Sequence, residues 1–248
     1  MPDLDEDDDP PKPAPWRRRS FVAVLALIII GVLAVAGGAV GLMRELNRHA
    51  TPAEVGAATQ AELTTRWERL PAGKIFPSQL AYLDSAGLSV RLTRSGIARP
   101  AGCARSIDPA VARVLVANGC RTVLRASYVD PTGTLAVTVG IAVFPSNVAA
   151  ARAAQAASFG DGAGLDAFSV PGTAASGFGN AQRQLFGATY PDHGPYIFLT
   201  TVGFADGRVR TSGAADPALE DLATAAPGAL VTILTRTSDT CQEQDVRC

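Results

Sequence analysis

The stretch SFVAVLALIIIGVLAVAGGAVGLM, residues Ser20–Met43, carries no charged side chain. At about 1.5 Å of rise per residue, a helix of this length crosses the roughly 30 Å hydrocarbon core of a membrane. Lys12 and Arg17–Arg19 precede the stretch, whereas Arg44 and Arg48 follow it. Because an excess of Lys and Arg marks the cytoplasmic side, we expect a single-pass protein of the cell membrane, with its N-terminus in the cytoplasm and its C-terminal domain extracytoplasmic.

A cleaved signal peptide is the competing interpretation. A basic region before the apolar run fits it, and Ala34-Val35-Ala36 offers small residues to a peptidase. However, the apolar region of a signal peptide spans about 7–15 residues, and this run is much longer, which favours an uncleaved anchor. Gly37 and Gly41 form a GxxxG pattern, which lets two membrane helices approach closely. Glycine is common in membrane helices, so this pattern leaves the oligomeric state open.

The anchor divides the chain into four predicted segments. They are an acidic, proline-rich and disordered cytoplasmic tail (1–19), the transmembrane helix (20–43), a juxtamembrane helix (44–70) and an exported domain (71–248). The juxtamembrane helix is predicted from the capping box Thr51-Pro52-Ala53-Glu54, and Pro71 ends it. Its apolar face is expected to dock on the exported domain, while Glu62 and Arg66 are expected to form a weak i,i+4 pair. That face comprises Val55, Leu63, Trp67 and Leu70.

Charge and cysteine content restrict the function of the exported part. It carries 18 basic and 17 acidic residues of the 22 and 23 in the chain, so no strong field of one sign attracts nucleic acid, and we expect no nucleic-acid partner. All four cysteines, Cys103, Cys120, Cys241 and Cys248, follow the anchor. An even count in an oxidising compartment indicates two disulfides with three possible connectivities, of which we favour the sequence-local pairs Cys103–Cys120 and Cys241–Cys248. Neither spacing matches a zinc site.

Hydrophobic periodicity and turn residues predict an α+β domain in which helices pack on a mainly antiparallel sheet. Asp108 is expected to cap the helix over 109–118, and Asp130-Pro131-Thr132-Gly133 is expected to form a type I turn. An alanine-rich helix is expected to cover the valine face of the strand before it, and Pro227-Gly228 is expected to interrupt the last helix. The predicted strands are 88–93, 121–129, 134–144, 165–170, 182–190 and 196–204, and the predicted helices are 109–118, 147–158 and a segment from 217 onward.

No catalytic, cofactor-binding or metal-binding motif stands out, and no cofactor is predicted. His193 lies between turn-forming residues, with no G-x-S-x-G nucleophile motif in the chain. The glycine-rich run 159–164 lacks the strand-then-helix context of a nucleotide-binding turn, so we interpret it as a loop. Glu220-Asp221 is expected to be a solvated helix face. Seven arginines are expected to point outward from strands and helices, namely Arg91, Arg94, Arg99, Arg105, Arg113, Arg121 and Arg125.

A sequence pattern begins at Cys103, continues through Gly119-Cys120-Arg121-Thr122-Val123-Leu124-Arg125-Ala126 and Val137-Gly140, and ends at Phe144-Pro145. It resembles a group of single-pass membrane proteins of actinobacterial type whose exported domains carry two cysteine pairs. The resemblance covers about a quarter of the chain and implies no activity or site. The order of elements is also similar to that of Mog1/PsbP-like lipoproteins and of the extracytoplasmic sensor domains of bacterial serine/threonine kinases.

These observations favour a non-enzymatic, membrane-anchored extracytoplasmic domain that binds an envelope protein or a small ligand. The alternative is an envelope hydrolase or transferase with a carboxylate site that spacing does not identify. A cleft with two close acidic residues would favour the enzyme, and an apolar groove would favour binding. A third hypothesis is a sensor of small ligands that signals through dimerisation of the anchor.

Overall fold

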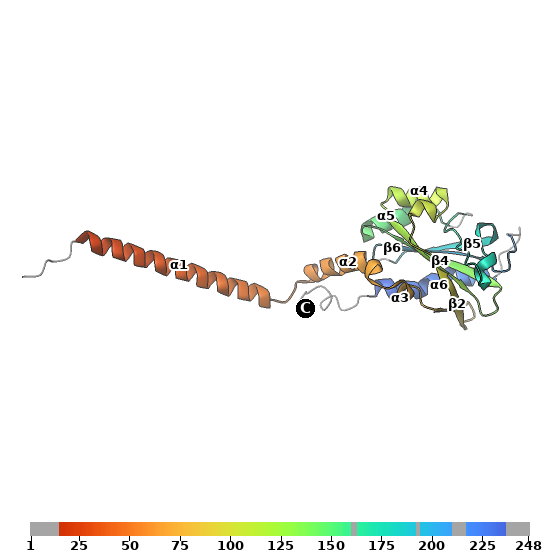
Figure 1. The fold of residues 1–248 in the computed structure, drawn as a ribbon, viewed down its shortest axis with the longest axis horizontal. Helices are drawn as coiled ribbons and strands as arrows, with labels where there is room; N and C mark the ends of the chain where they lie inside the picture. The colour runs from red at the N-terminus through yellow and green to blue at the C-terminus, as the bar shows by residue number, and fades with distance from the viewer. Residues whose placement is uncertain (1–14, 160–162, 192–193, 210–216, 237–248) are drawn as a thin grey trace, which may run out of the picture. The chain divides into compact units, whose positions relative to one another are not determined.

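The computed structural model describes residues 15–159, 163–191, 194–209 and 217–236, with side chains from Phe21 onward, and divides the chain after Ala50 into two compact units. In the first unit, helix α1 spans Pro15–Asn47 (Figure 1). Its 27 residues from Phe21 to Asn47 are long and apolar enough to cross a membrane, a test that a signal sequence also passes. The helix expected over 20–43 is present, and it extends beyond that range at both ends, from Pro15 to Asn47.

The second unit begins with helix α2 (Pro52–Arg69), followed by the short helix α3 (Ala72–Ile75). The predicted capping box is present: the backbone N–H of Thr51 donates to Glu54 Oε2 at 2.8 Å, and that of Glu54 donates to Thr51 Oγ1 at 3.3 Å. Leu63 is fully buried, and Trp67 packs against the core. The second half of α2 therefore docks on the domain, as its apolar face predicts.

Six antiparallel strands form a single sheet, which confirms the α+β class and the mainly antiparallel arrangement. Their order across the sheet is β1-β2-β3-β4-β6-β5, so every neighbouring pair except β4 and β6 follows directly along the chain. The predicted turn at residues 130–133 joins β3 to β4. The N–H of Gly133 donates to the carbonyl of Asp130 at 3.0 Å, which is the bond that closes a β-turn. The strands are β1 (Gln79–Leu83), β2 (Ser89–Ile97), β3 (Thr122–Val129), β4 (Leu135–Val143), β5 (Arg183–Thr189) and β6 (Tyr196–Phe204).

Helices cover both faces of this sheet (Figure 1). Helix α6 (Pro217–Thr235), with α2 and α3, covers the face formed by Val137, Val139 and Ile141. Helices α4 (Pro109–Ala117) and α5 (Asn147–Ala156) cover the opposite face. The expectation that α5 covers the valine face was wrong: both faces of β4 are buried, and the alternation along the strand does not tell which helix covers which face.

The expected strand 165–170 is also wrong. Only one isolated bridge forms there, between Ile107 and Leu165. The segment crosses the face of the sheet rather than extending its edge, and its backbone bonds to side chains: the N–H of Phe168 donates to Thr138 Oγ1 at 2.9 Å. Only Val170 in this segment is β-branched, and the segment's backbone groups bond to side chains and to loop carbonyls instead of a neighbouring strand: the N–H of Asp166 donates to the carbonyl of Ser106 at 2.9 Å.

Helix α6 runs through Pro227 without the interruption that the sequence predicted. A proline inside a helix leaves the carbonyl four residues earlier without its N–H partner. Here that carbonyl belongs to Ala223, and the hydroxyl of Thr200 on β6 donates to it at 2.8 Å. Packing against the sheet therefore replaces the missing bond and holds the helix together.

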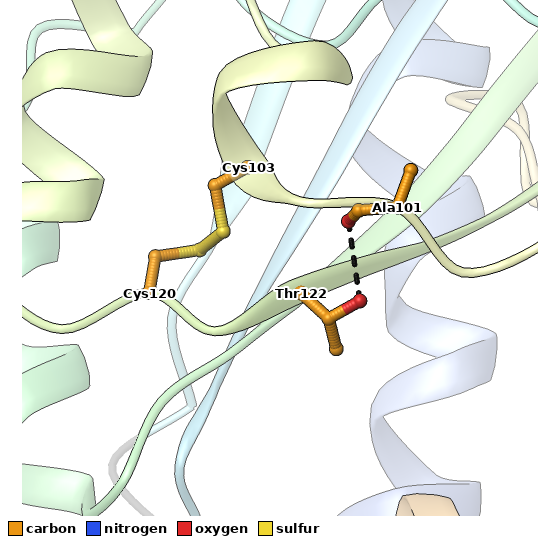
Figure 2. The surroundings of a disulfide bond; sticks show 4 residues. All are labelled: Ala101, Cys103, Cys120 and Thr122. Carbon is orange, nitrogen blue, oxygen red and sulfur yellow. Dashed lines mark hydrogen bonds between the residues drawn. A yellow bond between two sulfur atoms is a disulfide. The ribbon is translucent and has the colours of Figure 1, made fainter.

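The disulfide predicted between Cys103 and Cys120 is present, with Cα atoms 6.3 Å apart (Figure 2). It joins a short 3-10 turn (Cys103–Arg105) to the residues just before β3. Helix α4 lies between the two cysteines in the sequence. The hydroxyl of Thr122 donates to the carbonyl of Ala101 at 3.1 Å beside it. Cys241 and Cys248, His193 and part of the glycine-rich run lie outside the described residues, so the second predicted pair stays a prediction.

Candidate functional site

An apolar pocket of about 350 Å³ opens between α2, α3 and the adjoining ends of β2 and β3. Its volume falls at the lower end of the range for sites that hold small molecules. Among the described residues that line it, Glu68 alone is charged. The lining comprises Trp67, Glu68, Leu70, Ala72, Ile75, Phe76, Ile97, Ala98, Pro100 and Leu124. We call it the Trp67 pocket.

The wall supplied by α2 is held by a buried ion pair. Glu62 is 2% exposed and Arg66 5% exposed. Arg66 Nε donates to Glu62 Oε1 at 2.6 Å, and a second, parallel bond joins Arg66 Nη2 to Glu62 Oε2. The same guanidinium donates to the carbonyl of Leu234 at 3.1 Å, at the C-terminal end of α6, where the helix dipole favours a cation. The sequence predicted this pair but not its burial, because spacing along α2 says nothing about α6.

Two hydrogen bonds from buried tyrosines fix the backbone next to the pocket. The hydroxyl of Tyr196 donates to the carbonyl of Leu63 on α2, and that of Tyr128 donates to the carbonyl of Pro77 at 3.0 Å, just after α3. Burial raises the pKa of both hydroxyls well above the ordinary value for tyrosine. They therefore remain protonated donors across the physiological pH range.

The segment between β2 and the disulfide forms the remaining wall. The N–H of Ala98 donates to the carbonyl of Arg125 at 2.9 Å, and Ala101 bridges to Val123 of β3. Two residues beyond Ala101, the bond between Cys103 and Cys120 ties this segment to the residues before β3. The disulfide that the sequence predicted thus secures one side of a pocket that the sequence did not predict.

The indole N–H of Trp67 is buried and has no hydrogen-bond partner among the described residues. Three other buried polar atoms share that property, but Trp67 alone among their residues lines the pocket. Most buried donors in native proteins are paired, so an unpaired one at a pocket calls for an explanation. The sequence placed Trp67 on the face of α2 that docks on the domain. It did not predict that the indole nitrogen on that face would be buried without a partner.

The other predicted candidates have structural roles or do not converge. Arg94 donates to the carbonyl of Phe76 and thereby supports α3, while Arg125 donates to the carbonyl of Asp166 at 3.3 Å. Burial lowers the pKa of Arg125, and the nearby Asp166 opposes that shift. The carboxylate of Asp221 accepts hydrogen bonds from the backbone and hydroxyl of Ser85, so it is not simply a solvated group. The remaining five arginines of the predicted set are exposed and form no common site.

Asp108 precedes the first residue of α4, as predicted, but its carboxylate does not cap the helix. It accepts two bonds from Arg183, at 2.7 and 3.1 Å, and one from the N–H of Gly164 at 2.7 Å. The carboxylate therefore joins the start of α4 to β5 and to the loop across the sheet. The sequence did not predict that this carboxylate would pair with Arg183 instead of capping α4, because Arg183 lies 75 residues away along the chain.

Within the described ranges, no group of three or more His, Cys, Asp or Glu side chains could hold a metal ion. The Trp67 pocket and the neighbouring pocket between α2 and α6 are each lined by one carboxylate among the described residues, Glu68 and Glu62 respectively. Neither arrangement is the close carboxylate pair that acid–base hydrolysis of a glycosidic bond uses. No protein-family model, curated protein or solved structure matches the chain.

Proposed function

We propose that the protein is a membrane-anchored extracytoplasmic domain of the cell envelope that binds a ligand in the Trp67 pocket and catalyses no reaction. The observation that carries the proposal is the pocket itself: it is apolar, and a buried ion pair, a buried tyrosine and a disulfide hold the elements that form its walls. Ligand sites commonly combine such a lining with a few polar groups that orient the ligand.

Two further observations support the location. The apolar α1 is long enough to be an anchor, and four Lys or Arg residues lie before its apolar run, whereas Arg44 and Arg48 follow it. The disulfide between Cys103 and Cys120 fits an oxidising compartment, since thiols stay reduced in the cytosol. Both are consistent with a cytoplasmic tail and an exported domain.

Location is tested with epitopes at both ends of the full chain in spheroplasts. Added protease should remove the C-terminal epitope and spare the N-terminal one, which detergent should then expose. The opposite pattern would reverse the orientation, and recovery of the domain in the medium would indicate a cleaved signal peptide.

Binding is tested with the neutral fluorescent probe N-phenyl-1-naphthylamine and the full chain in lipid nanodiscs. Emission above that of empty nanodiscs should saturate for the wild type and fall for Ala98→Phe, which fills the pocket. Ala110→Phe, at an exposed position on α4, is the matched control and should bind like the wild type. Equal emission from all three proteins would contradict binding in this pocket.

A further inference from the structure

We infer that two copies of the chain pair through the free edge of β1, in antiparallel orientation and with Ala81 of one copy opposite Ala81 of the other. This interaction surface is separate from the Trp67 pocket and needs no ligand. Three features carry the inference: the positions of the outward backbone groups on β1, the uncharged sequence of the strand, and the exposed apolar side chains at the end of its hairpin.

The backbone of β1 presents hydrogen-bonding groups away from the sheet. β1 stands at one end of the strand order and pairs with β2 alone among the described strands. The carbonyl of Ser78 accepts a bond from the β2 side of the hairpin at 2.9 Å, and the N–H of Asp84 donates one to that side at 3.0 Å. Bonding positions alternate along an antiparallel strand, so the backbone groups of Gln79, Ala81 and Leu83 point outward.

The two edge strands of the sheet differ in how they resist pairing with another chain. Native edge strands commonly carry a charge, a proline or a bulge, which prevents such pairing. β5 has a bulge between Arg183 and Leu185, and Arg183 is charged. β1 has the sequence QLAYL and pairs with β2 in continuous register, so it has none of these features. The edge at β1 is therefore open to a further strand.

A second copy of the chain fits this edge because the edge is self-complementary. The outward groups lie at every second residue, and Ala81 is the middle one. In an antiparallel pair centred there, Gln79 faces Leu83 of the other copy, so each outward residue meets an outward residue and exchanges two hydrogen bonds with it. Any other antiparallel register leaves outward groups without partners. The interface is isologous, as in most two-fold dimers.

Apolar side chains are exposed at the end of the same hairpin. Leu83 is 64% exposed and Leu88 65% exposed, more than any other large apolar side chain described in the second unit. In the proposed register, the side chain of Leu83 lies on the same face as that of Gln79 of the other copy and directly opposite it, within contact distance. Pairing therefore removes apolar surface from water as well as satisfying the backbone.

The short length of β1 determines where the pair forms. A strand of five residues makes a small contact, so two copies in dilute solution associate weakly. Copies fixed in one membrane meet at a much higher effective concentration, which favours the pair there. This step rests on the proposed anchor, which the protease experiment on both epitopes tests separately.

The test cross-links the full chain in proteoliposomes through cysteines introduced on β1, with the wild type as the baseline for the four native cysteines. A short bis-methanethiosulfonate linker joins thiols that face each other. Ala81→Cys should form a covalent dimer by itself, with about tenfold more product than Ala110→Cys at an exposed position on α4. Gln79→Cys and Leu83→Cys should cross-link when mixed and far less when each is alone, because the register places these two positions opposite each other.

Two substitutions at position 81 determine whether the backbone edge makes the contact. In the mixture of Gln79→Cys and Leu83→Cys, Ala81→Lys places like charges opposite each other, and Ala81→Pro removes an outward N–H. Neither change removes a bond to β2, so the circular dichroism spectrum should stay that of the wild type. Both should reduce cross-linking to the wild-type baseline, whereas Ala110→Lys should leave it unchanged.

Each remaining outcome contradicts a stated part of the inference. If Ala81→Cys yields no more dimer than Ala110→Cys, the copies do not pair at β1. Cross-linking of Gln79→Cys with itself rather than with Leu83→Cys would indicate a parallel pair and overturn the antiparallel register. Cross-linking that survives both Ala81→Lys and Ala81→Pro would show that the contact does not depend on the backbone edge. The binding experiment on the Trp67 pocket is independent of all three results.

Discussion

The hydroxyl of Thr200 on β6 donates to the backbone carbonyl of Ala223 on α6 at 2.8 Å, and this carbonyl is the one that Pro227 leaves without an N–H partner. The side chain of a strand thereby completes the hydrogen bonding of a helix. Close approach at this point also requires Gly187 on β5, where a Cβ atom would lie 2.4 Å from the Ala223 carbonyl oxygen. The sheet thus supplies both the donor and the space that a helix with an internal proline needs at this position.

Replacing Thr200 with valine should destabilise the domain by about 1–3 kcal/mol, because the carbonyl of Ala223 would be buried without a partner. Urea unfolding followed by circular dichroism measures this. Thr201→Val is the control: its hydroxyl is buried without a partner among the described residues, so its loss should be neutral or stabilising. If Thr200→Val costs no more than Thr201→Val, the bond does not support α6.

Breaking the buried pair on α2 should be costly. Arg66→Met leaves the carboxylate of Glu62 with Arg69 alone, and we expect a loss of about 3–5 kcal/mol of unfolding free energy. The double variant Glu62→Leu with Arg66→Met should recover a large part of that loss, since no buried charge is left unpaired. Arg208→Gln, which breaks an exposed pair with Asp206, should cost no more than about 1 kcal/mol. The single variant Glu62→Leu completes the double-mutant cycle, and coupling between Glu62 and Arg66 is contradicted if the losses of the two single variants add up to the loss of the double variant.

Removing the disulfide should destabilise the domain by about 3 kcal/mol, since the two cysteines lie 17 residues apart. The double change Cys103→Ser with Cys120→Ser should lower the urea midpoint and weaken binding of N-phenyl-1-naphthylamine, because the bond secures one wall of the pocket. Non-reducing peptide mapping should recover the Cys103–Cys120 linkage, and it also tests the predicted Cys241–Cys248 pair. Crossed linkages between these pairs would contradict the local connectivity.

High pH should unfold the domain. Burial raises the pKa of Tyr128 and Tyr196 above the ordinary value of 10.0, so the folded state retains phenolic protons that the unfolded state releases. The resulting stability is complete below pH 10 and is lost as the pH rises from there towards the folded pKa values. Absorbance at 295 nm should show these two tyrosines ionising together with unfolding, followed in parallel by circular dichroism. Ionisation of all four tyrosines before unfolding would contradict their burial.

Features that depend on neighbouring residues were predictable from the sequence. The apolar run of α1, the capping box at Thr51 and the turn at Asp130 each arise from the local chemistry of a few consecutive residues. The Cys103–Cys120 pair and the α+β class followed from spacing and from the order of such elements. These features need no knowledge of the partners that they meet in space.

The tertiary structure decided which elements meet. Only packing against β6 explains why α6 continues through Pro227, and only contact with α6 buries the pair of Glu62 and Arg66. The apolar pocket at Trp67 likewise joins α2, α3 and two strands that are far apart along the chain. Local periodicity assigns a side chain to one face of its own element, but the identity of the covering element depends on long-range contacts, and the candidate site is built from those contacts.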